Sequence, residues 1–252
     1  MKHPDTHRAT LALLRAAASA AALAAGAASA TALPHYAHDF QTAVGTEWST
    51  TTTSATPTPY PFGERRFLGE FGTDQQVTLG LAGLPAHQWV RVTFDLYLIR
   101  TWDGDSSNGD FSYGDDRFAA GVAGGPTLLD ASFSNGNPAG QSHGPEPSNA
   151  PMTGAAETYS LGYWFDDGVQ DTGYVQDAVY RFDFTFAHDA PDLGLWFRSW
   201  LDQDIGDESW GLDNVAVWLG PAATPVPEPS SFALALLAAG ALGATSRRRT
   251  SR

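Results

Sequence analysis

Apolar and polar residues alternate with a period of two along several short runs of the chain. The clearest run covers residues 89–99, where one face carries Val90, Val92, Phe94, Leu96 and Leu98. A second run covers residues 178–187, where one face carries Tyr180, Phe182, Phe184 and Phe186. Because successive side chains of a strand point to opposite sides, each run predicts a β-strand with one buried face.

Weaker runs with the same period complete the pattern at residues 75–81, 127–133, 159–165, 193–197 and 210–219. Clusters of Gly, Asp, Asn and Pro separate the runs, and these residues favour turns. Residues 46–61, rich in Thr, Ser and Pro, predict an exposed loop. No run between the two ends of the chain has the 3.6-residue period of a helix. We therefore expect an all-β fold, an antiparallel β-sandwich of the jelly-roll kind.

The first 30 residues have the order of a secretory signal peptide. Basic residues come first, an alanine-rich stretch follows, and the small residues Ala28, Ser29 and Ala30 end it. Cleavage after Ala30 or Ala32 would remove this segment, so the Sec machinery and signal peptidase are expected partners. The alternative is a helix that the mature protein retains.

The other end of the chain combines a stiff spacer, an apolar run and a basic cluster. The residues that define it are Val226, Pro227, Glu228, Pro229, Arg247, Arg248 and Arg249. The prolines bar helix in the spacer, whereas the Leu and Ala residues that follow favour it. As a helix the apolar run spans roughly 20 Å, which is shorter than the roughly 30 Å hydrocarbon core. It predicts a short transmembrane helix whose arginines stay on the cytoplasmic side.

This box, apolar run and arginine cluster, in this order, resemble the PEP-CTERM sorting signal. The resemblance implies export by a Gram-negative bacterium, a transient inner-membrane anchor, recognition by an exosortase and cleavage near the Pro-Glu-Pro box. An ordinary C-terminal membrane anchor is the alternative. The expected parts are a signal peptide (1–30), a β-sandwich (31–220), a Pro-rich linker (221–231), a transmembrane helix (232–246) and a basic cytoplasmic tail (247–252).

Between the two sorting segments the chain is strongly acidic. Residues 31–225 hold seven arginines, no lysine and 26 acidic residues, a formal charge of −19. Such a surface repels phosphate backbones, which excludes nucleic acid as an expected partner, and it attracts divalent cations. The chain has no cysteine, so its loops lack the disulfides that an exported protein could form. We expect a structural Ca²⁺ to stabilise them instead.

The loop after the clearest strand has the composition of a calcium site. Its candidate ligands are Asp103, Asp105, Asn108 and Asp110, with glycines that allow a tight backbone. Ca²⁺ takes roughly six to eight oxygen ligands from such loops. The loop is not an EF-hand, because Asn108 stands where that motif has Gly. Asp115 and Asp116 are near enough in sequence to join, and a solvated turn is the alternative.

A second acidic loop, with Asp202, Asp204, Asp207 and Glu208, precedes the last strand. It either shares a cation with the first loop or supplies the acid/base pair of a glycosidase. Such a pair needs carboxylates about 5–9 Å apart across the sugar. Asp207 and Glu208 are adjacent, and adjacent strand residues point to opposite faces, which disfavours catalysis. The sequence also lacks a Gly-x-Ser-x-Gly elbow and a zinc-type histidine pair, so we expect no enzymatic activity.

Asp39-Phe40 opens the predicted sandwich, and the segment 210–215, Trp-Gly-Leu-Asp-Asn-Val, closes it. These ends resemble jelly-roll modules of the carbohydrate-binding and MAM type. The resemblance implies a structural calcium near the first and last strands, held here by Asp39 and Asp213. Gln41 stands where those modules have Glu.

Two tryptophans, Trp196 and Trp200, fall on the face opposite the apolar residues of the run 193–197. They are the candidates for stacking on a sugar, and packing in the core is the alternative. The sequence as a whole favours a non-enzymatic protein of the cell surface or extracellular matrix. A carbohydrate-binding module that recognises exopolysaccharide is the alternative, and a glycoside hydrolase or lyase is the second alternative.

Overall fold

The structure, a computed structural model, describes residues 33–57, 63–105, 114–136, 140–165 and 173–220. These ranges contain strands, turns and loops but no helix, and hence no helix that could cross a membrane. The strands belong to a compact unit that begins at Pro34. The predicted signal peptide, linker, transmembrane helix and basic tail lie outside the described residues.

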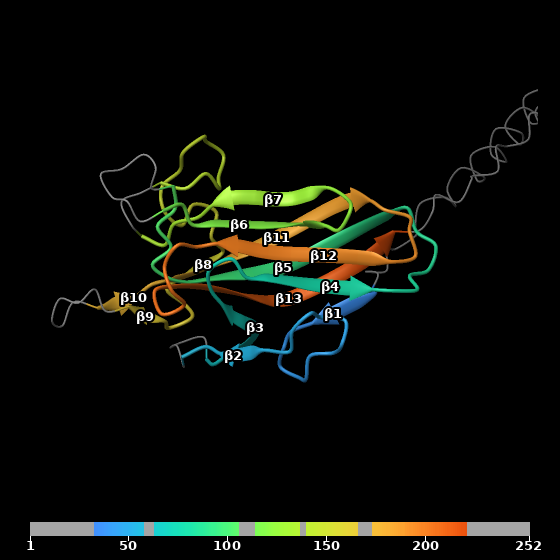
Figure 1. Cartoon of the computed structure of the whole chain (residues 1–252), viewed down its shortest axis with the longest axis horizontal. Coiled ribbons are helices and arrows are strands. Elements are labelled where there is room, and N and C mark those ends of the chain that lie inside the picture. The colour runs from blue at the N-terminus through green and yellow to red at the C-terminus, as the bar shows by residue number, and fades with distance from the viewer. Residues whose placement is uncertain (1–32, 58–62, 106–113, 137–139, 166–172, 221–252) are drawn as a thin grey trace, which may run out of the picture. The chain divides into compact units, whose positions relative to one another are not determined.

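Seven antiparallel strands form the larger of two main sheets (Figure 1). Their order is β2–β3–β13–β5–β11–β8, and β1 also pairs with β13. Their bounds are β1 Tyr36–His38, β2 Thr53–Ala55, β3 Arg66–Phe71, β5 Trp89–Arg100, β8 Glu157–Thr158, β11 Asp177–Ala187 and β13 Glu208–Gly220. Of the three long strands, β5 lies between β13 and β11, so their apolar positions form one continuous face.

Four antiparallel strands form the smaller sheet, in the order β4–β12–β6–β7. Their bounds are β4 Gln76–Leu81, β6 Arg117–Val122, β7 Thr127–Ser132 and β12 Leu193–Trp200. Two further strands, β9 (Trp164–Phe165) and β10 (Tyr174–Val175), pair only with each other among the described residues.

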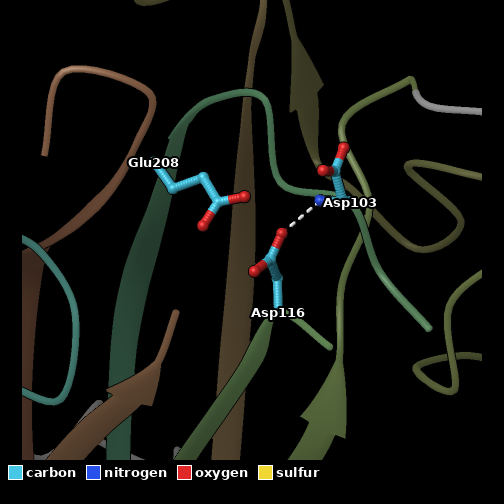
Figure 2. A group of neighbouring side chains, drawn as sticks. All are labelled: Asp103, Asp116 and Glu208. Carbon is cyan, nitrogen blue, oxygen red and sulfur yellow. Dashed lines mark hydrogen bonds between the residues drawn. The ribbon is translucent and has the colours of Figure 1, made fainter. Parts of the chain in front are cut away.

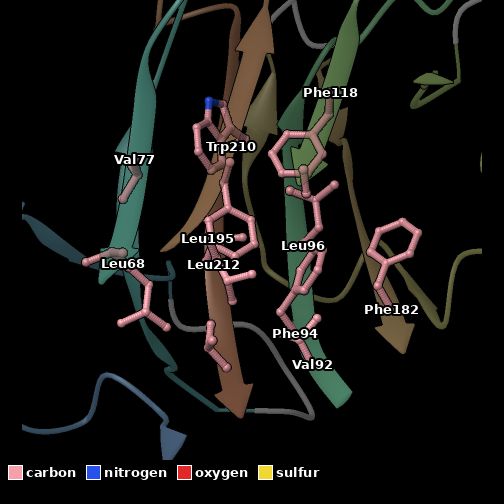
Figure 3. Close-up of a cluster of buried hydrophobic side chains, with 14 of the residues drawn as sticks. Leu68, Val77, Val92, Phe94, Leu96, Phe118, Phe182, Leu195, Trp210 and Leu212 are labelled. Atoms are coloured by element: carbon pink, nitrogen blue, oxygen red, sulfur yellow. The ribbon is translucent and has the colours of Figure 1, made fainter. Parts of the chain in front are cut away.

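The facing side chains of the two sheets form the main core (Figure 3). Phe94 of the larger sheet meets Phe197 of the smaller one edge to face, with ring centroids 5.1 Å apart. Trp210 also bridges the sheets, because its ring centroid lies 4.9 Å from that of Phe71 and 5.1 Å from that of Phe118. The predicted all-β antiparallel sandwich is confirmed.

The last strand, β13, changes the positions that it presents to the core halfway along. Leu212 points into the core at an even position, and Val215 does so at an odd one. The register against β5 shifts between Asp213 and Ala216, and Asn214 has a φ of 50°. This β-bulge absorbs one residue, so both halves of the strand bury their apolar side chains.

A smaller apolar cluster covers part of the outer face of the larger sheet, and it contains Phe67, Tyr97, Ile99, Leu161, Tyr163 and Val179. Leu161 and Tyr163, which follow β8, lie over the sheet here. The buried carboxylate of Asp177 accepts hydrogen bonds from the backbone N–H groups of Leu161, Gly162 and Tyr163 at 2.9–3.1 Å. The predicted strand 159–165 is therefore wrong except at β9, because its middle turns around Asp177 instead of pairing.

Among the strands that the alternating pattern did not predict are β3 and β6, and one predicted loop is partly buried. β3 does not alternate because both of its faces are covered, Phe67 by the outer cluster and Leu68 by the main core. β6 uses Gly121 on its outer side, where the indole of Trp196 leaves no room for a side chain. The predicted exposed loop 46–61 contains β2, and its Trp48 is only 4% exposed.

Candidate functional site

Three buried acidic residues meet at one end of the sandwich, and we call them the carboxylate cluster (Figure 2). Asp103 lies in the loop that follows β5, Asp116 immediately precedes β6, and Glu208 is the first residue of β13. β5 and β13 are neighbours in the larger sheet, whereas β6 belongs to the smaller one. The cluster therefore joins segments of both sheets that are far apart in the sequence.

The three carboxylates are close together and shielded from solvent. One oxygen from each lies within 4.8 Å of the others. Asp103 is 4% exposed, and Asp116 and Glu208 are 0% exposed. The backbone N–H of Asp103 donates to Oδ2 of Asp116, and the backbone N–H of Gln203 donates to Oε2 of Glu208 at 3.4 Å. Backbone donors thus hold one oxygen of each of these two carboxylates.

The second oxygen of each of these carboxylates has no donor. Oδ1 of Asp116 and Oε1 of Glu208 are buried without a hydrogen-bond partner. Burial raises the pKa of both carboxyl groups. The charge of Asp116 and a side-chain hydrogen bond between the two groups raise the pKa of Glu208 further, and the charge of Asp103 adds to the rise of both. An ionised carboxylate in such surroundings costs several kcal/mol unless it is paired. The cluster must therefore hold shared protons or a cation.

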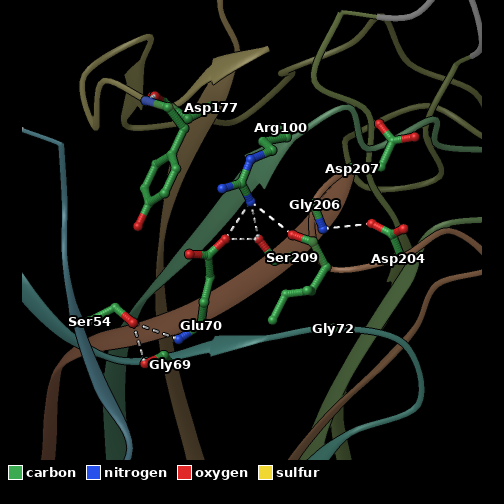
Figure 4. A network of polar contacts seen from close by, with 12 residues as sticks. Ser54, Gly69, Glu70, Gly72, Arg100, Asp177, Asp204, Gly206, Asp207 and Ser209 are labelled. Atoms are coloured by element: carbon green, nitrogen blue, oxygen red, sulfur yellow. Dashed lines mark hydrogen bonds and ion pairs between the residues drawn. The ribbon is translucent and has the colours of Figure 1, made fainter. Parts of the chain in front are cut away.

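The arginine that pairs with Glu208 in the strand register does not supply that positive charge. The guanidinium of Arg100 forms an ion pair with Glu70 and donates to the Ser209 hydroxyl at 3.1 Å and the Ile205 carbonyl at 2.9 Å (Figure 4). Among the described residues, the charges that act on Glu208 are the acidic Asp103 and Asp116.

A glycine shapes the loop that carries Asp103. Gly104 has a φ of 74°, in the left-handed region, and a Cβ there would collide with the carbonyl of Gly140. The Gly104 carbonyl accepts a hydrogen bond from the backbone N–H of Asp116 at 2.9 Å. This bond places Asp103 and Asp116 side by side, so the turn glycine noted in the sequence has a direct role in the site.

The structure brings one of the four predicted ligands of the first acidic loop into the cluster. That residue is Asp103, and Asp116 joins it from the same stretch of sequence. Asp105 pairs through its backbone with Asp115 and Gly140 and is not one of the three clustered residues. Asn108 and Asp110 lie outside the described residues.

The second acidic loop contributes Glu208 to the cluster, the charge of its Asp202 also raises the pKa of Asp116, and its Asp204 and Asp207 form hydrogen bonds elsewhere. Oδ1 of Asp204 accepts a hydrogen bond from the Gly206 N–H at 2.8 Å (Figure 4). The Asp207 carboxylate accepts one from the Thr101 hydroxyl. A glycosidase pair must face a sugar, but Glu208 is fully buried. The geometry disfavours Asp207 and Glu208 as an acid/base pair.

The two residues implied by the resemblance to jelly-roll modules are not part of the carboxylate cluster. Asp39 is exposed, and its Oδ1 accepts a hydrogen bond from the backbone N–H of Gln41 at 3.2 Å. Asp213 lies at the bulge of β13, 3% exposed, and accepts a hydrogen bond from the Tyr97 hydroxyl at 2.7 Å. Burial raises the pKa of Asp213 to about 6.

The two candidate sugar-stacking residues, Trp196 and Trp200, are half-buried on the outer face of the smaller sheet, on the side that the alternation predicts. The indole of Trp196 stands over Gly121. The guanidinium groups of Arg117 and Arg198 lie over the Trp200 ring, 5.0 and 4.6 Å from its centroid. These cation–π contacts compete with any sugar that would stack on Trp200.

Comparison with solved structures gives distant likenesses. A carbohydrate-binding module of Cellvibrio mixtus lichenase 5A, solved with cellotriose, is 10% identical, with a TM-score of 0.34, over 73% of this chain and 97% of the module. The cleaved K3 adhesin domain of Lys-gingipain from Porphyromonas gingivalis is 12% identical, with a TM-score of 0.35, over 74% of this chain and 99% of that domain. At TM-scores this low, the likenesses establish no shared ligand or activity.

A family GH115 4-O-methyl-α-glucuronidase with specificity for decorated arabinogalactans is 11% identical, with a TM-score of 0.35. The alignment covers 75% of this chain but 18% of the glucuronidase, so the chain spans less than a fifth of that enzyme. No curated protein sequence matches the chain.

The C-terminal segment gives a definite match. Residues 225–249 match the PEP-CTERM protein-sorting motif, at the position where the box, the apolar run and the arginines occur in the sequence. The chain is therefore an exported protein that carries a PEP-CTERM protein-sorting motif, the signal for exosortase processing at the membrane of Gram-negative bacteria.

Proposed function

We propose that this is a non-enzymatic protein of the cell surface or extracellular matrix, whose β-sandwich is displayed outside the inner membrane once the C-terminal segment has been processed. The observation that carries the proposal is the sorting motif at 225–249, which follows the last strand, β13, after a short spacer. The motif then determines where the protein is located, and the sandwich is the part that remains outside the inner membrane.

The burial of the clustered carboxylates supports a role without catalysis. General acids and bases of glycosidases must reach the glycosidic oxygen and a water or the anomeric carbon. Asp116 and Glu208 are 0% exposed, so a polysaccharide could not approach them in this conformation. Their position between strands of both sheets suits a structural role.

Changing Pro227, Glu228 and Pro229 together to alanine should block processing, because the box is the part of the motif that precedes the membrane segment. We expect the variant to keep its full C-terminal mass and to stay in the inner-membrane fraction, whereas the wild type becomes shorter and leaves it. Fractionation, immunoblotting of an epitope inserted in the sandwich, and intact-mass measurement would show both effects.

The matched control changes Pro221 and Thr224 to alanine, which alters the same spacer outside the box and should leave processing intact. Normal processing of the box variant would contradict the proposal.

Exopolysaccharide is the partner of the alternative function. If the wild type is retained on a polysaccharide column and Trp196→Ala is not, the function is carbohydrate binding and not display alone. If the protein releases reducing sugar from the polysaccharide, the function is hydrolysis.

A further inference from the structure

We propose that Asp103, Asp116 and Glu208 bind one Ca²⁺ that fastens β5, β6 and β13 together at one end of the sandwich. This site differs from the pair Asp39 and Asp213 that the resemblance to jelly-roll modules implies. It takes one carboxylate from the larger sheet's loop after β5, one from the first residue of β13 and one from the start of the smaller sheet's β6.

The unpartnered oxygens are the observation that points to a ligand. Buried polar atoms in proteins nearly always have a hydrogen-bond partner. Oδ1 of Asp116 and Oε1 of Glu208 have none, although both residues are 0% exposed, and one oxygen of each of the three carboxylates lies within 4.8 Å of the others (Figure 2). A cation bound by the cluster would supply a partner for carboxylates that the protein leaves incompletely paired.

The charge of the cluster favours a divalent cation over a shared proton. Three carboxylates within 4.8 Å of one another carry up to three negative charges, and one shared proton neutralises a single charge. Arg100, which pairs with Glu208 in the register, is engaged with Glu70. A divalent cation neutralises two negative charges. It also leaves in place the hydrogen bonds from the backbone N–H groups of Asp103 and Gln203.

The ligand set selects Ca²⁺ among divalent cations. All three side chains offer oxygen, which hard cations prefer, whereas zinc sites use His or Cys. Mg²⁺ keeps several waters in a strict octahedron, and these fully buried side chains leave little access for water. Three carboxylates can supply up to six oxygens when each binds in bidentate fashion, close to the coordination number of Ca²⁺.

Calcium titration of the metal-free protein tests the site. The exported protein is stripped with EDTA, and CaCl₂ or MgCl₂ is added back. We expect the midpoint of thermal unfolding to rise by about 5–10 °C at a calcium concentration 100 times the Kd, and less with magnesium. Tb³⁺ should bind at the same place and luminesce when tryptophan is excited, because Trp102 directly precedes Asp103. An unchanged midpoint together with no sensitised luminescence would overturn the proposal.

The variant Glu208→Gln separates a cation site from a purely structural carboxyl group. It keeps the shape of the side chain and removes one buried charge. We expect it to lose the calcium-induced rise, while its metal-free form unfolds at or above the temperature of the metal-free wild type. A Glu208→Gln protein that keeps the full rise would refute the site.

Asp39→Asn is the matched control, because Asp39 is an exposed carboxylate that the resemblance to jelly-roll modules also implies as a ligand. It should keep the full calcium-induced rise, and loss of the rise would move the site away from the cluster. If Glu208→Gln does not fold, Asp103→Asn is measured in the same way, and the Tb³⁺ signal of the wild type needs no variant at all.

Discussion

Replacing Asp177 by alanine should lower the free energy of unfolding by about 3–5 kcal/mol. The change removes the acceptor of three backbone N–H groups, those of Leu161, Gly162 and Tyr163, and each buried donor left unpaired costs about 1–3 kcal/mol. The turn at residues 161–163, which contributes Leu161 and Tyr163 to the outer apolar cluster, then loses its side-chain attachment to β11. Urea denaturation followed by tryptophan fluorescence measures the loss as a lower midpoint concentration.

The matched control for this prediction is Asp183→Ala on the same strand. Asp183 is an exposed carboxylate paired with Arg91 at 2.6 Å, and exposed ion pairs contribute little to stability. We expect a much smaller change than for Asp177. Equal effects of the two substitutions would show that the backbone bonds of Asp177 do not hold the segment.

Replacing Phe94 by alanine should destabilise the protein by about 3–5 kcal/mol, the usual range for losing a buried phenylalanine. Phe94 is 1% exposed and lies between Phe182 on the neighbouring strand and Phe197 on the opposite sheet, with ring centroids 5.2 and 5.1 Å away. Its loss opens a cavity between the sheets. Calorimetry should show a midpoint lower by about 10 °C.

Thr93→Ala is the control for this core substitution, because Thr93 is the preceding residue and faces the outer side of the same strand. A surface change of this kind should cost well under about 1 kcal/mol. A loss below about 1 kcal/mol for Phe94→Ala would mean that the sheets repack around the missing ring and that the interface between them is loosely packed.

The sequence pattern predicted β12, which has one covered face, but not β3, which is covered on both faces. β12 alternates between buried and half-buried residues along its whole length, so its pattern predicted its start and its faces, although the strand continues beyond residue 197 to Trp200. β3 buries Phe67, Leu68 and Gly69 in succession, and a run without a period of two gives no such signal. The turn at 161–163 was missed because its organiser, Asp177, lies outside that segment.

The candidate site was predictable in its parts but not in its assembly. Turn composition pointed to Asp103, and the idea that the two acidic loops share a cation pointed to Glu208. Which of the acidic residues meet depends on how β5, β6 and β13 are brought together by the two sheets, and no local pattern contains that information. Asp39 and Asp213 fitted a resemblance of the chain ends, but neither belongs to the clustered trio.

The position of β13 within its sheet has a mechanical consequence. This strand is hydrogen-bonded to β5 on one side and to β1 and β3 on the other, and the chain continues from it toward the sorting segment. Tension applied through the tail while it is gripped at the membrane would load both rows of bonds in shear, along the strand. An edge strand would instead peel away one bond at a time, so this connectivity suits a body that is pulled from its C-terminal end.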